Sequence, residues 1–219
     1  MKKNFLSTLL ACLGSTVAVF SGAAEDLTPL EIEFPPPFLI GTPVPIKVPH
    51  LEASSTRPPE IMVPAGVTNL AAGKEVTSSS EFLIIGELEF VTDGDKFSEE
   101  GYFAELDTGL QWLQIDLGKE AELYAAVVWH YHSQKRVYHD IIIQLSNDPE
   151  FADNVTTVFN NDHDDSAGMG RGPDKAYIET HQGKMIPLGR NKARYIRLYS
   201  NGNTTDELNH YVEVEVFGR

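Results

Sequence analysis

The sequence predicts an all-β protein, an antiparallel sandwich or jelly roll that follows an extended, proline-rich arm. Three observations lead to this prediction. Short apolar runs rich in Val, Ile, Tyr and Phe follow one another from residue 69 to the end. Turn residues such as Gly, Asn and Asp separate these runs. No segment longer than about two turns shows the apolar period of a helix.

The N-terminal end has the composition of a secretory signal peptide. A basic pair, Lys2 and Lys3, precedes the apolar residues 5–20, and small side chains follow them. The apolar stretch is short for a membrane span, which needs about 20 residues. We therefore expect cleavage after Ala23 or Ala24 and a periplasmic or secreted protein.

The chain has a single cysteine, Cys12, which lies inside the predicted signal peptide. Its surroundings also fit a lipoprotein box, so lipid anchoring is the minor alternative. After cleavage no thiol would remain for a disulfide, a thiolate metal site or a cysteine nucleophile. The net charge of −15 argues against nucleic acid and anionic membranes as partners, and it suits calcium.

Three segments follow from these patterns: a signal peptide over 1–24, a proline-rich arm or linker over 25–66, and a β-domain over 67–219. Ten of the thirteen prolines lie between Pro29 and Pro64. Proline fixes φ and lacks the amide donor, which excludes helix and central strand and favours polyproline II. The arm could be a spacer that holds the domain away from a partner, or it could lie along the surface of its own domain.

Within the β-domain, the apolar runs give the expected strands in order. The clearest run contains Leu113, Ile115 and Leu117, which alternate with polar residues and so mark one buried face. The expected strands are Phe82–Ile85, Leu110–Leu117, Leu123–His132, Val137–Leu145, Val155–Phe159, Ala193–Tyr199 and Tyr211–Phe217.

The last expected strand alternates strictly between two faces. Its valines would point into the core, while two glutamates on the opposite face must be solvated or hold something. The predicted inner face is Val212, Val214 and Val216, and the predicted outer face is Tyr211, Glu213, Glu215 and Phe217.

Several blocks in this order resemble the discoidin-like domain, the coagulation-factor type C family that includes the family 32 carbohydrate-binding modules. The resemblance covers residues 69–219 and implies an eight-stranded, galactose-binding-like jelly roll with its termini close together. It is specific for the fold and weak for the ligand, because members bind sugars, lipids or proteins through variable loops. The matching blocks are Asn69–Ala71, Gly73–Lys74, Val76–Ser79, Thr92–Asp95, Trp112–Gly118, Ala193–Leu198 and Val212–Gly218.

The resemblance implies a structural calcium ion in the loop that begins at Asp93. Asp93, Asp95 and Ser98 match ligand positions of the sugar-binding members, and Glu213 matches the carboxylate from the last strand. Calcium takes six to eight oxygen ligands, and Gly94 allows a tight turn between the two aspartates. The same residues would also make an ordinary Asp-Gly turn.

The resemblance also places a ligand site on loops at one end of the sandwich. Polar groups would grip sugar hydroxyls there while an aromatic ring, Tyr138 or Tyr131, covers the C–H face of the sugar. Trp129 and any single histidine could equally be interior residues. The expected ligand-binding residues are His130, His132, Arg136, Tyr138, Asn203 and His210.

A metalloprotein is a different possibility. His130 and His132 are two residues apart and would share one strand face, where His139 or His163 could complete a zinc or copper site. His-x-His in a β-protein is usually not a metal site, however.

Enzyme signatures are missing: there is no Gly-x-Ser-x-Gly elbow, no phosphate-binding Gly-Lys-Ser/Thr loop and no His-Glu-x-x-His. We therefore expect an exported, non-catalytic binding module that recognises carbohydrate through loops on a calcium-stabilised jelly roll. The alternative is a structural or accessory subunit of an envelope or extracellular complex, docked through the loops and the arm. In either case we expect a glycan or an envelope protein as partner, no nucleic acid and no membrane insertion.

Overall fold

The computed structural model describes residues 25–53 and 57–219. The predicted signal peptide and the lipoprotein alternative at Cys12 lie outside these residues. The described part of the chain consists of strands, loops and one 3-10 turn, η1 (Leu88–Thr92), as expected for an all-β fold. No helix among the described residues is long and apolar enough to cross a membrane.

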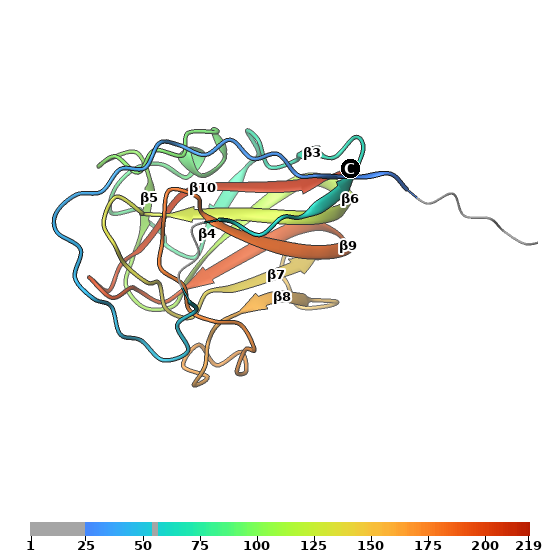
Figure 1. Cartoon of the computed structure of the whole chain (residues 1–219). Helices are drawn as coiled ribbons and strands as arrows, with labels where there is room; N and C mark the ends of the chain where they lie inside the picture. Colours follow the sequence, from blue (N-terminus) through green and yellow to red (C-terminus); the bar gives the residue numbers. More distant parts are fainter. Residues whose placement is uncertain (1–24, 54–56) are drawn as a thin grey trace, which may run out of the picture.

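One antiparallel sheet system is built around two long strands, β6 (Gln111–His130) and β9 (Lys184–Ser200). Its hydrogen-bonded order is β3-β10-β6-β9-β7-β8, with β4 added to β6 and β5 added to β10 (Figure 1). The shorter strands are β3 (Thr68–Asn69), β4 (Val76–Ser78), β5 (Ala104–Leu106), β7 (Ile142–Ser146), β8 (Thr156–Asn160) and β10 (Asn209–Gly218).

The two long strands belong to both layers of the sandwich. The first part of β6 pairs with β4 and with the second half of β9, whereas its last part pairs with β10 and with the first half of β9. Register shifts separate these parts, between Asp116 and Ala121 and between Leu123 and Ala125. Bulges of this kind bend a strand, so a single strand can cross from one layer to the other.

The second register shift also changes which residues of β6 face inward. Leu113, Ile115 and Leu123 belong to the main core between the layers, but beyond the shift the even-numbered Val128 is the inward residue. The odd-numbered Trp129 instead belongs to a second apolar cluster on the outer face of the sheet. The members of this outer cluster are Phe103, Ala125, Val127, Trp129, Tyr131, Met185, Val212 and Phe217.

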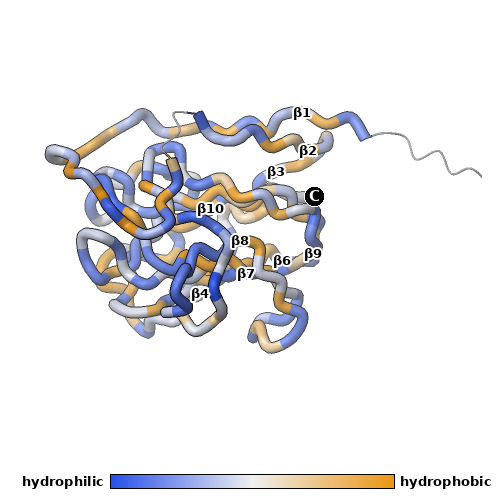
Figure 2. Tube along the Cα trace, turned by 60° about the horizontal axis from the view of Figure 1, so that its bottom comes forward, coloured by the Kyte–Doolittle hydropathy of each residue, from blue (hydrophilic) through white to orange (hydrophobic). Residues whose placement is uncertain are grey.

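The outer cluster is covered by the N-terminal segment. Strands β1 (Leu27–Pro29) and β2 (Met62–Pro64) pair antiparallel, and Leu30, Ile32 and Phe34 pack against the cluster. Figure 2 shows β1 and β2 alongside β3 and β10. Of the two expectations for the arm, the structure has the second: the segment lies along its own domain.

Further along, the segment runs around one end of the sandwich (Figure 1). Ile40 N donates to the Ser133 carbonyl oxygen at 2.6 Å, and Glu52 N donates to the Ala176 carbonyl oxygen at 2.8 Å. At the opposite end, Arg219 and Glu25 form an ion pair. There β3 also pairs with the end of β10, Thr68 opposite Gly218, so the two ends of the β-domain lie side by side, as the resemblance implied.

Several strand predictions need correction. Leu110–Leu117 and Leu123–His132 are one continuous strand, because β6 bends instead of turning at Gly118. Phe82–Ile85 forms only an isolated bridge at Ile85, and Val137–Leu145 shortens to β7 because residues 137–141 form a loop.

The alternation predicted for the last strand is also partly wrong. A register shift lies between Tyr211 and Glu213, so Tyr211 joins the main core and Val212 joins the outer cluster. The two glutamates follow the second of the expected alternatives: both are buried, and Glu213 accepts from Gly94 N while Glu215 forms an ion pair with Lys96.

Candidate functional site

One end of the sandwich carries a cavity of about 230 Å³ that combines three loops with the start of β10. Residues from the loop after η1, the β6–β7 loop and the β9–β10 loop meet there. We call it the Arg136 cavity, and it is lined by Glu100, Phe103, Glu105, Tyr131, Gln134, Arg136, Asp206, Leu208 and His210.

Arg136 lines this cavity, is only 3% exposed, and is held by contacts to three side chains. Its Nη1 donates to Asp206 Oδ2 at 3.2 Å, and its Nη2 donates to Gln134 Oε1 at 2.9 Å. The guanidinium lies 4.6 Å from the ring centroid of Tyr131. The Nε atom is buried and has no hydrogen-bond partner among the described residues. The arrangement fixes a planar cation against an aromatic face.

His210 links the cavity to the interior. Nδ1 lies 2.9 Å from the Tyr138 hydroxyl and Nε2 lies 3.2 Å from Glu105 Oε2. Burial lowers the pKa of His210 to about 4, and the positive charge of Arg136 acts in the same direction. The imidazole is therefore neutral at neutral pH, with Nε2–H donating to Glu105 and Nδ1 accepting from Tyr138.

Burial also raises the pKa of Glu105, and the negative charge of Asp206 adds to this effect. Glu105 was not a predicted site residue. It sits directly opposite His210 in the β5–β10 pairing. A three-residue strand such as β5 has too few residues for an alternation pattern to be read from sequence. The sequence therefore offered no signal for this cross-strand pair.

Asn203 lies behind the cavity wall and organises the β9–β10 loop. Its Nδ2 donates to Asp206 Oδ1 at 2.6 Å, and its Oδ1 accepts from the backbone N–H groups of Thr205 and Asp206. Because Asp206 holds Arg136, Asn203 positions the arginine indirectly. Asp206, like Gln134, was not among the predicted residues.

His130 and Tyr138 form the layer beneath His210. His130 is fully buried, its Nδ1 lies 2.8 Å from Glu179 Oε1, and its ring stacks on Tyr138 with centroids 4.5 Å apart. Tyr138 is 2% exposed and does not line the Arg136 cavity, whereas Tyr131 lines it although this ring is itself only 6% exposed. Of the two aromatic candidates, the geometry favours Tyr131.

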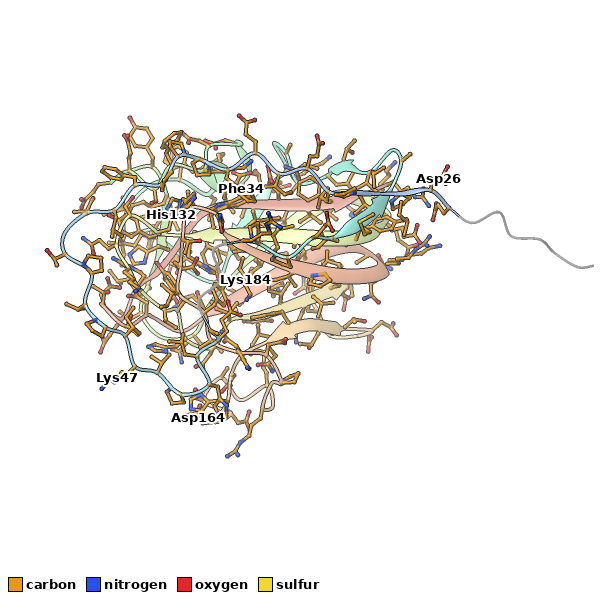
Figure 3. All side chains as sticks on the ribbon, viewed as in Figure 1. Asp26, Phe34, Lys47, His132, Asp164 and Lys184 are labelled. Carbon is orange, nitrogen blue, oxygen red and sulfur yellow. The ribbon has the colours of Figure 1, made fainter. Side chains whose placement is uncertain are left out.

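His132 does not join the others. It points to the side covered by the arm, where it lines a separate cavity with Phe38 and Leu39. Its Nε2 lies 2.9 Å from the Lys96 carbonyl oxygen, and burial lowers its pKa. Figure 3 shows His132 near the segment that carries Phe34.

The histidines do not converge on one metal position. His130 and His132 contact different partners, while His139 and His163 line a third cavity. In the described part of the chain, the set of three possible metal ligands whose ligand atoms lie within 4.8 Å of one another is Asp140, Asp162 and Asp164. This set contains no histidine.

The predicted calcium loop does face the last strand. Gly94 N donates to Glu213 Oε2 at 3.1 Å. Burial raises the pKa of Glu213 to about 9, and repulsion from Glu215 and Asp93 acts in the same direction. Glu213 Oε1 is buried without a hydrogen-bond partner among the described residues. A buried carboxylate oxygen without a partner fits a cation ligand.

The remaining two predicted ligands make internal contacts. Asp95 Oδ1 accepts from Phe97 N at 2.9 Å, and Ser98 Oγ lies 2.6 Å from Ser133 Oγ. Asp93 Oδ1 likewise accepts from Asp95 N at 2.7 Å. Of the four predicted ligands, Glu213 is therefore the one whose buried oxygen has no partner among the described residues.

Comparison with known proteins gives the fold. No protein-family model matches the chain, and no curated protein matches it in sequence. Among solved structures, CpGH89 from Clostridium perfringens, in complex with its substrate GlcNAc-alpha-1,4-galactose, is 20% identical with a TM-score of 0.51. The match covers 69% of this chain and 14% of the hydrolase, so this chain corresponds to a small part of that protein.

Two smaller proteins are also similar. The CBM32 of AlyQ, in complex with 4,5-unsaturated mannuronic acid, is 22% identical over 65% of this chain and 93% of its own, with a TM-score of 0.46. The lectin domain of lectinolysin, complexed with Lewis B antigen, is 18% identical over 68% and 96%, with a TM-score of 0.47. The likeness to CpGH89 concerns the fold alone, which in this chain is an all-β, antiparallel, galactose-binding-like jelly roll.

Proposed function

We propose that this chain is an exported, non-catalytic carbohydrate-binding module that takes its ligand in the Arg136 cavity. The observation that supports this most is Arg136 itself, buried, fixed by Asp206 and Gln134, and seated 4.6 Å from the Tyr131 ring centroid. A rigid donor beside an aromatic face suits a sugar, which offers hydroxyl groups on its edge and C–H groups on its face.

The charge of the cavity favours neutral or amine-bearing sugars. Three carboxyl groups, those of Glu100, Glu105 and Asp206, surround the single cation Arg136, while His210 is neutral. An acidic sugar would bring another negative charge into this group, and repulsion at short range opposes its binding.

We further propose that calcium braces the adjacent loop. Asp93 and Glu213 would hold the ion, which would fix the loop that leads to Glu100 and Phe103 in the cavity wall. The Oε1 atom of Glu213, which is buried and has no hydrogen-bond partner among the described residues, supports this proposal.

Binding to a glycan array, with the wild-type chain and Arg136→Met compared, tests the function. Methionine keeps the length of the buried stem but removes the donors and the charge, so we expect the fold to be unchanged and binding to be lost. Lys135→Met, at an exposed neighbouring position, is the matched control and should bind like the wild type. Absence of any binding by the wild-type chain, or equal binding by Arg136→Met, would refute the assignment.

An accessory subunit of an envelope complex remains the second candidate, because the docked arm exposes apolar side chains. Phe38, Ile40 and Val44 are exposed on the end of the molecule around which the arm runs. Capture of a stoichiometric protein partner by the wild-type chain, lost in Phe38→Ser, would favour this function over sugar binding.

A further inference from the structure

A second cavity, of about 320 Å³, lies on the other side of the β6–β7 loop from the Arg136 cavity. Most of its lining comes from three segments far apart in sequence: residues 48–49 of the arm, residues 138–140 of the β6–β7 loop, and residues 161–166 after β8. Ala176 and Asn201 complete it. Figure 3 shows Lys47 and Asp164 at this end of the molecule. We call it the Asp140 cavity. Its volume is at the lower end of the range of small-molecule sites, about 300–1,000 Å³.

The arm wall of this cavity is fastened in place. Leu51 bridges to Ala176, and Lys184 Nζ contacts Glu52 Oε2 at 2.7 Å. These contacts bring Val48 and Pro49 against the loop that follows β8, so the arm supplies an apolar wall.

The opposite wall is rigid because Asp162 organises it. This fully buried carboxylate accepts from the backbone N–H groups of Asp164, Asp165 and Ser166 through Oδ1, and from that of Ala167 through Oδ2. A loop tied in this way presents its side chains in fixed positions before a ligand arrives.

Asn161 provides a donor that nothing in the described part of the chain uses. Its Oδ1 accepts from Ile141 N at 2.7 Å, which fixes the orientation of the amide. Its Nδ2 therefore carries the hydrogens, is buried, and has no hydrogen-bond partner among residues 25–53 and 57–219. Asn161 is 6% exposed and lines the cavity. Such a donor is costly unless an acceptor meets it.

Acceptors lie across the same cavity. Asp140 Oδ2 accepts from Ser166 Oγ and from Asn201 Nδ2, both at 2.8 Å, and Asp164 adds a second, exposed carboxylate. These acids disfavour an anionic ligand. A metal ion fits less well, because both Asp162 oxygens are used by backbone donors and Asn161 presents N–H instead of oxygen.

From this geometry we propose that the Asp140 cavity is a second, separate binding site, for one neutral or amine-bearing sugar unit. Hydroxyl groups would accept from Asn161 Nδ2 and donate to Asp140, while Val48 and Pro49 cover an apolar face. The site does not depend on ligand binding in the Arg136 cavity.

Amide-resolved NMR titration of the isotopically labelled chain tests this proposal. Glucose, glucosamine and glucuronate serve as probes, since each of the last two differs from glucose in one substituent, an amine at one ring position or a carboxylate at another. We expect glucose and glucosamine to shift amide signals of residues 139–140 and 161–167, and glucuronate to leave them unchanged.

Three variants complete the test. Asn161→Asp keeps Oδ1 but replaces the donor by an acceptor, and it should weaken these shifts at least about tenfold. Asp164→Asn removes an exposed charge but keeps the Oδ1 atom that accepts from Ser166 N, so we expect the fold to be unchanged. This variant should bind glucosamine more weakly than glucose. Arg136→Met should leave this set of shifts intact.

The two sites can fail separately. Shifts near residues 203–210 without shifts at 161–167 would overturn the second site while leaving the Arg136 cavity standing, and the reverse pattern would do the opposite. Unchanged binding in Asn161→Asp, with Asp164→Asn showing no preference between the probes, would also overturn it.

Discussion

The side chain of Glu213 in the last strand accepts a hydrogen bond from the backbone N–H of Gly94, 119 residues earlier, at 3.1 Å. The contact ties the turn between Asp93 and Asp95 to the sheet. It also leaves a carboxyl group inside the protein with a pKa of about 9, because burial removes the water that would stabilise its charge.

This raised pKa predicts how calcium and pH act together. Without a cation, Glu213 is protonated in the folded chain and ionised in the unfolded chain between pH 4.5 and about 9, so its contribution to stability falls as pH rises through this window. Calcium would replace the proton. We expect calcium to raise the melting temperature more at pH 8 than at pH 5, measured by calorimetry against a chelator.

Glu213→Gln is the matched variant for that measurement. It keeps the shape and the acceptor for Gly94 N but removes the charge, so the calcium effect should vanish while the calcium-free protein becomes less sensitive to pH. An equal calcium effect in this variant would exclude Glu213 as a ligand.

His210 predicts an acid-side effect of its own. Its pKa is lowered from 6.5 to about 4. Between pH 6.5 and pH 4, His210 is therefore protonated in the unfolded chain but neutral in the folded chain. Stability from this group is full above pH 6.5 and is lost toward pH 4, by at most about 3 kcal/mol. Chemical denaturation at several pH values should show a shallower acid slope for His210→Gln than for the wild type.

Glu105 provides the internal control, since burial raises its pKa and thus acts in the opposite direction. Glu105→Gln should make the acid slope steeper. If both variants change the slope in the same direction, the neutral His210–Glu105 contact described above is wrong.

The arm can be released by one substitution. Phe34 packs against the outer cluster, so Phe34→Ala should weaken arm docking by about 1–2 kcal/mol and increase hydrogen exchange or protease cleavage across residues 30–40. Phe38→Ala is the matched control, since that ring is 57% exposed and should have no effect. If residues 30–40 exchange hydrogen and are cleaved equally in both variants, the apolar contact of Phe34 does not hold the arm.

Gly172 should not accept a side chain. A Cβ placed there would lie 1.8 Å from the Asn160 carbonyl oxygen, which is backbone and cannot move aside. We expect Gly172→Ala to cost several kcal/mol and to disturb the amide signals of residues 160–174. Gly168→Ala meets no atom within 4 Å, but its φ of +72° is strained, so it should cost less. Denaturant titration of both variants decides the order.

The sandwich could be read from sequence because period-two alternation is local information. Leu113, Ile115 and Leu117 show it without reference to any neighbour. The joining of two predicted strands at Gly118 could not be read, since a bend and a turn use the same residues. The outer cluster was equally hidden, because Trp129 looks like any interior aromatic until the arm is seen to cover it.

For the site, sequence reasoning found the residues whose type is distinctive and missed those that hold them. Arg136 and His210 meet in one cavity, whereas His132 lines a different cavity together with residues of the arm. Glu105 and Asp206 come from a short strand and a loop, and no spacing rule links them to the arginine. Whether these residues bind sugar stays a prediction.

The register shift between Leu123 and Ala125 has a consequence for how this chain can vary. Beyond the shift, side chains alternate between the main core and the outer cluster, so the position of each residue relative to the shift decides which one it enters. Replacing any one of them alters a single contact, but adding or removing one residue there would turn Trp129 inward and Val128 outward together. The length of this stretch, more than its composition, decides which of the two apolar layers each residue enters.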